Sequence, residues 1–379
     1  MKNSLNLSAI AVKQGESKGR IFKENFSDTR SEYQRDRDRI LHSAAFRRLK
    51  HKTQVFVSHE GDHYRTRLTH SLEVSQIARS ICRIFGLNED LAETLSIAHD
   101  IGHPPFGHAG EDALRSLMNE HEGFDHNDQA IRIVHLLEKK YFDFDGLNLT
   151  WETLEGLVKH NGPIEGNVPP TILKLSNEFD LELGEYSSLE AQIASISDDI
   201  AYNNHDIDDG LRAGFFTFNE LRELPLIGDI IERLPKSFET RDIQRINNEI
   251  TRRSTNLMIS DIIINIKKNI ELEHVTNLRQ IRSLKRPIVD FSSEMKSNVE
   301  SVRNFLSERM YSHESINDMS KNAHQIVTFL YNFLINANHR TLNELKIDLN
   351  RDDSKNRIIC DFIAGMTDNY ARTIYEKYS

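Results

Sequence analysis

The chain has 379 residues, of which 38% are hydrophobic, and a formal net charge of −10 at pH 7. This length can bury a substantial core as one large domain or two. The acidic balance argues against bulk binding to nucleic acid, and no apolar run approaches the roughly 20 residues of a membrane span. The two cysteines, Cys82 and Cys360, form no secreted disulfide framework, so we expect a cytoplasmic protein.

Apolar residues recur at helical spacing along most of the chain, whereas alternating runs separated by hairpin turns are hard to find. The sequence therefore predicts an all-α fold. Residues 1 to about 19 are polar and contain Gly15, Ser17 and Gly19. We expect this segment to be a flexible arm and residues 20–379 to form a single all-α unit.

Residues 20–70 are locally basic, with 12 Lys or Arg against 7 Asp or Glu. This gives +5 here and −15 for the remainder, a distribution that favours a small polyanion over a long one. The alternative is a solvated helix face, because arginines alternate with aspartates over residues 35–39. Single-stranded nucleic acid is a further possible partner, although no aromatic stacking series accompanies the basic zone.

A first amphipathic stretch begins near Arg65 and places His70 close to its first turn. Its apolar positions are Leu72, Ile77, Ile81 and Ile84. Arg67 lies three residues before His70 and hence on the same helical side, where a guanidinium could reach a phosphate. The competing interpretation of Arg67 is an exposed structural arginine.

The central stretch, residues 99–108, reads His-Asp-Ile-Gly-His-Pro-Pro-Phe-Gly-His. A helix is predicted to begin at Asn88, a good N-cap, and to stop before the Gly-x-Pro-Pro break. Adjacent helical residues point about 100° apart, so His99 and Asp100 converge on one ion only near such an end. For an isolated His-Asp pair, a satisfied and partly buried imidazole is the better interpretation, so a metal site needs two further ligands.

Two shorter helices follow the central stretch, over about 109–119 and 151–160. A polar turn that contains His126 lies between them. Lys159 falls in the last turn of the second helix, where a cation often only opposes the helix dipole. A phosphate-binding role for Lys159 is the alternative to that structural one.

A helix over about residues 188–209 carries two opposite stripes. Its apolar stripe consists of Leu189, Ile193, Ile196, Ile200 and Ile207. Asp198, Tyr202 and Asp206 line the other side at i, i+4 and i+8, flanked by small alanines, which predicts a helix covered on both sides. Carboxylates on a covered face need a metal or ligand, and Asp198 rather than Asp199 shares this side.

From Phe215 onward the chain is a series of charged amphipathic helices, for example over 249–268 and 299–310. It contains no repeat and no second catalytic motif. We expect this portion to wrap the core and to mediate subunit contacts; an independent helical domain is the alternative.

The order of His70, His99-Asp100 and Asp198 resembles that of the HD superfamily of metal phosphohydrolases. Four stretches resemble its deoxyguanosine-triphosphate triphosphohydrolase-like branch: Lys52–Phe56, Thr66–Val74, His99–Glu111, and Asp198–Tyr202 with His205 and Asp206. The likeness runs from about Arg20 to near the C-terminus and is most specific up to Gly210. It implies an HD core over about residues 66–210 and a C-terminal helical portion over about 211–379.

The resemblance implies that a deoxynucleoside triphosphate is split into deoxynucleoside and intact triphosphate. His70, His99, Asp100 and Asp198 are the expected metal ligands; two imidazoles and two carboxylates suit Mn²⁺ or Fe²⁺, while Mg²⁺ suits the phosphates. Relatives form dimers or hexamers, so we expect a homo-oligomer. Base preference and any allosteric nucleotide site are not encoded by a motif.

The resemblance also assigns roles around the metal. It places Gln54 at the sugar, Tyr202 and Asp206 at the sugar and phosphates, and His103 near the α-phosphate. His108 is expected to protonate the leaving 5′ oxygen, with Asp125 or His126 as relay partner. The alternative for His108 is a loop histidine without a catalytic role. Alternative functions are another HD-type nucleotide phosphohydrolase and a nucleotide-sensing regulatory protein.

Overall fold

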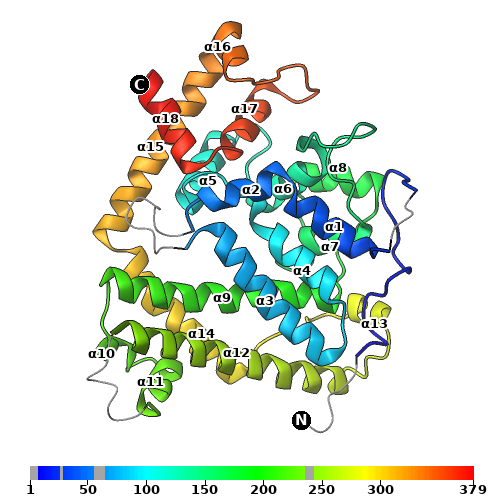
Figure 1. The fold of residues 1–379 in the computed structure, drawn as a ribbon, viewed down its shortest axis with the longest axis vertical. Helices are drawn as coiled ribbons and strands as arrows, with labels where there is room; N and C mark the ends of the chain where they lie inside the picture. Colours follow the sequence, from blue (N-terminus) through cyan, green and yellow to red (C-terminus); the bar gives the residue numbers. More distant parts are fainter. Residues whose placement is uncertain (1–6, 26–28, 55–64, 235–242) are drawn as a thin grey trace.

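The computed structural model describes residues 7–25, 29–54, 65–234 and 243–379. Within these ranges the chain is helical, with isolated β-bridges but no β-strand, which confirms the predicted all-α fold. Figure 1 shows an elongated molecule with the C-terminal helices gathered at one end. No helix in these ranges is both long enough and apolar enough to cross a membrane.

The first half of the chain supplies two N-terminal helices and the helices that carry the sequence motifs. They are α1 (Glu32–Leu41), α2 (Ala44–Arg48), α3 (Arg67–Phe85), α4 (Glu89–Ala98), α5 (Gly107–Leu117), α6 (His126–Arg132), α7 (Trp151–Val158), α8 (Pro170–Glu178) and α9 (Leu189–Ala213). Short 3-10 helices cover η1 (Leu49–His51) and η3 (His99–Gly102), and a π-helix, η4, covers Ile133–Leu137.

The second half wraps this core. Its helices are α10 (Phe218–Leu221), α11 (Pro225–Glu232), α12 (Ile243–Leu272), α13 (Leu278–Ser283), α14 (Ser293–Leu306), α15 (Glu314–Asn336), α16 (His339–Glu344), α17 (Lys355–Ala364) and α18 (Asp368–Tyr378). A π-helix, η6 (Ser307–Tyr311), extends α14. The predicted helices over 249–268 and 299–310 correspond to α12 and to α14 with its π-helical extension.

Three clusters of buried apolar side chains hold these helices together. One joins α3 and α9 to α11, α12 and α14. A second lies among α1, α4, α6, α7 and α8, and a third joins α5 to α15, α17 and α18. Burial of apolar surface stabilises each cluster by roughly 25 cal/mol per Å².

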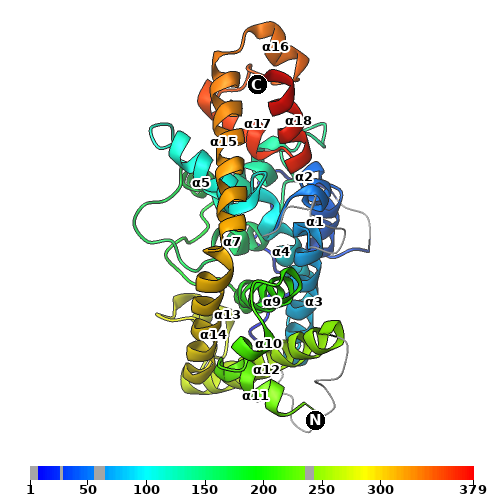
Figure 2. The ribbon, with the colours of Figure 1, turned by 90° about the vertical axis from the view of Figure 1, so that its left-hand side faces the viewer.

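Helix α9 runs through the middle of the molecule. It packs against α3, α4, α7, α12 and α14, and Figures 1 and 2 both show it beside α3 and above α12. Its apolar stripe and its Asp198–Asp206 side are therefore both covered, as the sequence predicts. A polar side chain on this helix must find its partner inside the protein.

The helix ends near the central motif follow the predicted signals. The Asn88 side chain accepts a hydrogen bond from the Leu91 amide at the start of α4, and Ser188 accepts one from Ala191 at the start of α9. Thr66 caps α3, whose residue His70 lies in the first turn. Gly214 ends α9 at φ 74°, a left-handed conformation that glycine adopts without strain.

The predicted apolar face of α3 is only half right. Ile77 and Ile81 are buried, but Leu72 is 50% exposed and Ile84 is 38% exposed. The buried face is completed by Val74, Ala78 and Phe85. At about 100° per residue, Leu72 falls on the face opposite the buried residues and Ile84 at the edge of the buried face. Periodicity therefore selects the helix correctly but assigns these two positions incorrectly.

Two segments of the first forty residues differ from the sequence-based expectation. The sequence predicts a flexible arm over 1–19, whereas Leu7 and Val12 are buried and the Val12 amide donates to Glu190. The charge alternation over residues 35–39 left a solvated helix face as one alternative, yet Asp36 is fully buried and accepts hydrogen bonds from Thr150. Both segments therefore stabilise the core.

Candidate active site

Four segments bring the motif residues to one place. Helix α3 carries His70, η3 carries His99 and Asp100, α9 carries Asp198, and His160 follows the end of α7. The last turn of α4 tightens into the 3-10 helix η3 at His99. With about three residues per turn, this ending turns His99 and Asp100 inward together, as the Gly-x-Pro-Pro break predicts.

His70, His99 and Asp198 form a compact group whose candidate ligand atoms all lie within 4.8 Å of one another. His70 Nε2 lies 2.8 Å from Asp198 Oδ1, and His99 Nε2 lies 3.6 Å from the same oxygen. His99 Nδ1 donates to the Ser96 carbonyl at 2.7 Å. This hydrogen bond leaves the Nε2 lone pair of His99 directed into the group.

Asp100 lies at the edge of this group. Its Oδ1 accepts a hydrogen bond from Arg67 Nη1 at 2.9 Å and lies 3.6 Å from His99 Nε2. Its Oδ2 is buried and has no hydrogen-bond partner in the described part of the chain, and the same holds for His99 Nε2. These two unpaired atoms lie beside the ligand atoms of His70 and Asp198. A divalent cation that binds this mixture of nitrogen and oxygen ligands would satisfy both unpaired atoms.

The charges in the group also favour a cation. Burial lowers the pKa of His99, but the carboxylates of Asp100 and Asp198 outweigh burial and raise that pKa to about 9. Burial alone would raise the pKa of Asp198, yet His99 and hydrogen bonds from His160 and His70 hold it well below its usual range. Both carboxylates thus remain ionised, and a divalent ion would balance them once it displaces the proton from His99.

His160 is a member of this cluster that sequence reasoning missed as a ligand candidate. Its Nε2 lies 3.4 Å from Asp198 Oδ2, and its ring stacks on that of His99 at 5.3 Å between centroids. The sequence places His160 in the last turn of the predicted helix over about 151–160, a position where a cation often only opposes the helix dipole. Its distance from the other ligands along the chain gives no spacing signal.

Behind His70 lies a chain of hydrogen bonds that fixes its tautomer. Glu73 accepts from His205 Nε2, and His205 Nδ1 lies 3.3 Å from His70 Nδ1. Because an ionised carboxylate only accepts, His205 Nδ1 carries the lone pair and His70 Nδ1 the proton. His70 Nε2, hydrogen-bonded to Asp198 Oδ1 at 2.8 Å, would exchange its proton for a metal at the candidate position.

A second cluster lies beyond Asp100 and is centred on Glu111. His103 Nδ1 lies 3.0 Å from Asp100 Oδ1, and the His103 ring stacks on His126 at 4.0 Å. Glu111 Oε1 is 2.9 Å from His126 Nδ1, and Glu111 Oε2 is 3.6 Å from His108 Nδ1. The structure therefore brings together the three histidines expected in catalysis and joins them to the metal group through Asp100.

Glu111 is the residue in this cluster whose role the sequence analysis did not assign. Burial alone would raise the pKa of Glu111. Hydrogen bonds from His108 and His126 lower that pKa by more than burial raises it, so the carboxylate stays ionised. It lies three residues after His108 on one helix face, a spacing at which side chains meet. That spacing could have identified it as the partner of His108, in place of Asp125. Asp125 instead caps α6.

Arg67 and Gln54 also have buried polar atoms without hydrogen-bond partners. Arg67 is 1% exposed and uses Nη1 for Asp100, while its Nε and Nη2 have no partner among the described residues. Gln54 is 8% exposed and its Oε1 is also unpartnered there. Buried polar atoms of this kind favour a ligand that supplies the missing partners.

Tyr202 and Asp206 lie on α9 beyond Asp198, as expected, and meet Tyr311 from η6. The Tyr311 hydroxyl is 2.8 Å from that of Tyr202 and donates a hydrogen bond to Asp206. Burial raises the pKa of Asp206 to about 7, with Asp209 adding to the effect. Tyr311 lies more than one hundred residues along the chain, so no local motif could have identified it.

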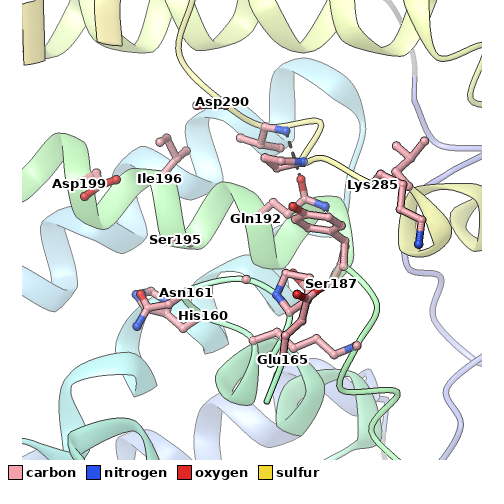
Figure 3. Close-up of a pocket in the computed structure, with 18 residues that line it drawn as sticks. His160, Asn161, Glu165, Ser187, Gln192, Ser195, Ile196, Asp199, Lys285 and Asp290 are labelled. Carbon is pink, nitrogen blue, oxygen red and sulfur yellow. Dashed lines mark hydrogen bonds between the residues drawn. The ribbon is translucent and has the colours of Figure 1, made fainter. Parts of the chain in front are cut away.

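Lys159 is turned away from this group. Its ammonium lies 3.2 Å from Glu155 and is fully buried, so the structure pairs it within α7. The neighbouring His160 opens onto a cavity of about 720 Å³, which Asp199, Glu165 and Lys285 also line. Figure 3 shows His160 and Asn161 on one side of this cavity and Lys285 on the other, with Gln192 between them. Lys159 also borders the cavity.

Comparison with known proteins agrees with this geometry. Residues 67–203 match the HD domain, and residues 289–377 match the phosphohydrolase-associated domain. These matches place the chain among the HD-type phosphohydrolases, a class of hydrolases.

Full-length relatives narrow this class. Proteins of Parvibaculum lavamentivorans and Bradyrhizobium sp. are each 49% identical, over 97% and 95% of this chain and 95% and 93% of their own lengths. A Paracoccus denitrificans protein is 46% identical over 95% of this chain and 96% of its own. All three are named deoxyguanosinetriphosphate triphosphohydrolase-like proteins. The chain belongs to this family.

The hydrogen-bond chain behind His70 predicts an effect on metal affinity. His205→Ala should weaken Mn²⁺ binding about 10- to 100-fold, because His70 loses the acceptor that fixes its tautomer. His205→Gln should retain more affinity, since its amide both donates and accepts. Isothermal titration of the metal-free proteins with Mn²⁺ measures both. Equal affinity in wild type and His205→Ala would contradict this role.

The raised pKa of Asp206 predicts a pH-dependent stability cost. Asp206 titrates near 7 in the folded protein and about 3.9 in an unfolded chain, so stability is lost as pH rises through this window. Asp206→Asn should therefore raise Tm by about 1–3 °C at pH 8, with a smaller gain at pH 5. Scanning calorimetry of the ligand-free protein tests this, and the same gain at both pH values would refute it.

Proposed function

We propose that the protein is a metal-dependent deoxynucleoside triphosphate triphosphohydrolase. It hydrolyses the bond between the 5′ oxygen and the α-phosphorus, releasing deoxynucleoside and inorganic triphosphate. The names of the relatives support the substrate class. The observation that carries the proposal is the continuity of the two clusters: Asp100 lies within 3.6 Å of both His99 and His103.

His70, His99 and Asp198, with Asp100 beside them, would hold the divalent metal, and His160 is a further donor. Mn²⁺ or Fe²⁺ suits this mixture of imidazole and carboxylate, and Mg²⁺ suits the substrate phosphates. The bound ion would polarise the α-phosphoryl group and lower the pKa of a water. Asp100 and Asp198 are held ionised by their neighbours, so they are ready to ligate at neutral pH.

Arg67 and Gln54 position the substrate. The free Nε and Nη2 of Arg67 donate to phosphate oxygens while Nη1 keeps its bond to Asp100. Gln54 offers a neutral acceptor to a sugar hydroxyl, and Tyr202 and Asp206 bind the sugar and phosphate on the α9 side. Lys159 can contribute to phosphate binding only after its Glu155 pair opens.

His108 supplies the proton that the departing 5′ oxygen needs. When water attacks the α-phosphorus, the P–O5′ bond breaks and the alkoxide takes a proton from His108. The imidazole is 62% exposed and its Nδ1 lies 3.6 Å from the Glu111 carboxylate, which positions the ring. His126 shares Glu111, and His103 lies between this pair and the metal group, near the α-phosphate.

Product analysis tests the proposed reaction. Purified protein with Mn²⁺ should convert one or more deoxynucleoside triphosphates, supplied singly and as a mixture, to deoxynucleoside and triphosphate. Asp198→Ala should abolish the conversion. Monophosphate and pyrophosphate would instead indicate cleavage at a different bond by another HD-type phosphohydrolase. No turnover even in the mixture would favour a nucleotide-sensing role.

The role of His108 predicts a separation of metal binding from turnover. His108→Ala should keep wild-type Mn²⁺ affinity and lower kcat by about 10²- to 10⁴-fold, because it removes only the general acid. Glu111→Gln should also lower kcat, since the amide no longer positions the His108 ring as the carboxylate does. His324→Ala, an exposed histidine on α15, is the matched control. Near-normal kcat in His108→Ala would exclude this assignment.

A homo-oligomer, a dimer or a hexamer, remains a prediction of the family resemblance, and single-stranded nucleic acid remains a weaker one. The structure reduces the support for the latter. Arg39, in the basic zone, donates to the Leu147 carbonyl and to Glu24, and Arg20 pairs with the buried Asp36. These guanidiniums are engaged inside the protein and are not presented to a phosphate backbone.

A further inference from the structure

A cavity of about 530 Å³ lies at the seam between the HD core and the C-terminal helices. Arg48 of α2, Gln129 of α6 and the π-helix η4 line its core side. Phe362 of α17 and Tyr370 of α18 line the opposite side. The cavity is separate from the group around Asp198, and its volume suits a small organic ligand.

Two hydrogen-bond donors in the wall of this cavity have no partner in the described part of the chain. Gln129 is 1% exposed, and its Oε1 accepts from Arg357, which fixes the amide so that Nε2 is left over. Arg48 Nε is also buried without a partner. Burying such donors unpaired is unfavourable, so a ligand that offers acceptors is favoured here.

The two buried carboxylates in the wall are already engaged, and the exposed Asp348 accepts from the Asn350 amide. Glu138 accepts from the Ala44 and Ala45 amides at 3.1 and 2.8 Å and so caps α2. Asp361 accepts from Arg132 and pairs with Arg351. Burial lowers the pKa of Arg48 by more than the nearby Glu138 charge raises it. The Arg48 charge is therefore only partly compensated within this wall.

Much of the remaining wall is apolar and partly aromatic. It includes Ile133, Leu137, Ile347, Ile358, Phe362 and Tyr370. Lys346 stands exposed at the same cavity. The other cations of the wall are already paired, Lys139 with Asp145 and Arg351 with Asp361. Donors and cations on one part of the wall and apolar rings on another match a ligand with an anionic group and a flat apolar body.

We propose that this seam cavity binds a small organic oxyanion, a phosphate or carboxylate carried on an aromatic or apolar body. The oxyanion accepts hydrogen bonds from Arg48 and Gln129, and the body packs against Phe362 and Tyr370. The site is distinct from the proposed hydrolytic centre, and the proposal stands whether or not that centre hydrolyses deoxynucleoside triphosphates.

Titration calorimetry of the metal-free, full-length protein with phenyl phosphate tests the proposal. Wild type should bind, and Arg48→Met should bind about tenfold more weakly or worse, because a charged hydrogen-bond donor is lost. Arg47→Met is the matched control: Arg47 is the adjacent residue of α2, is exposed and does not line the cavity. It should keep wild-type affinity. Inorganic phosphate should bind more weakly than phenyl phosphate, because it lacks the apolar body.

A second variant guards against loss of folding in Arg48→Met. Tyr370→Trp places an indole at the cavity, and its fluorescence should change on addition of phenyl phosphate. Wild type, whose one tryptophan is Trp151, is the fluorescence control. When Lys346→Glu, at an exposed position, is added to Tyr370→Trp, the change should need a higher ligand concentration.

Three outcomes would each overturn the proposal. The first is absence of phenyl phosphate binding to wild type, and the second is equal affinity in Arg48→Met and Arg47→Met. The third is an indole fluorescence in Tyr370→Trp that does not respond to the ligand.

Discussion

The Asp198 carboxylate is the interaction on which the site depends. One half-buried side chain contacts three imidazoles: His70 at 2.8 Å, His160 at 3.4 Å and His99 at 3.6 Å. These histidines come from three separate segments, and Asp198 itself lies on α9, which packs against five other helices. A buried charge is tolerated only with such partners, so the packing of α3, η3 and the end of α7 around α9 is also the assembly of the site.

Polar atoms left unpaired mark where this packing serves function rather than stability. Arg67, His99, Asp100 and Asp206 each keep at least one buried atom without a partner in the described part of the chain. Other buried polar groups are satisfied: Asp36 accepts from Thr150 and Thr153, and Asp128 accepts from Thr171. Unpaired atoms also occur away from this site, for example in Glu190 and Asn247, but Arg67, His99 and Asp100 gather beside Asp198. The protein therefore retains there a desolvation cost that a bound cation and an anionic substrate would relieve.

Much of this arrangement was predictable because it is local. The i, i+4, i+8 line on α9, the Asn88 cap and the helix end at His99 depend only on nearby residues and helical geometry. His160, His205 and Tyr311 could not be found in this way, because each reaches the site through tertiary packing. The alternation over residues 35–39 could not decide between a solvated and a buried face for the same reason. It has the pattern of a solvated surface, but the partners of Asp36 are Thr150 and Thr153, more than one hundred residues away.

The two cavities beside the core differ in whether they share residues with the Asp198 group. The one that His160 opens onto shares a residue with the Asp198 group, so its occupancy is tied to the chemistry there. The seam cavity shares none of that group; its wall combines α2 and α6 with α17 and α18, elements far apart in the sequence. Gln129 nevertheless lies three residues after His126 on the short helix α6, and its backbone N–H donates to the Asp125 carbonyl. Because α6 is a short and continuous helix, a restraint on Gln129 is also a restraint on the backbone that presents His126 to Glu111.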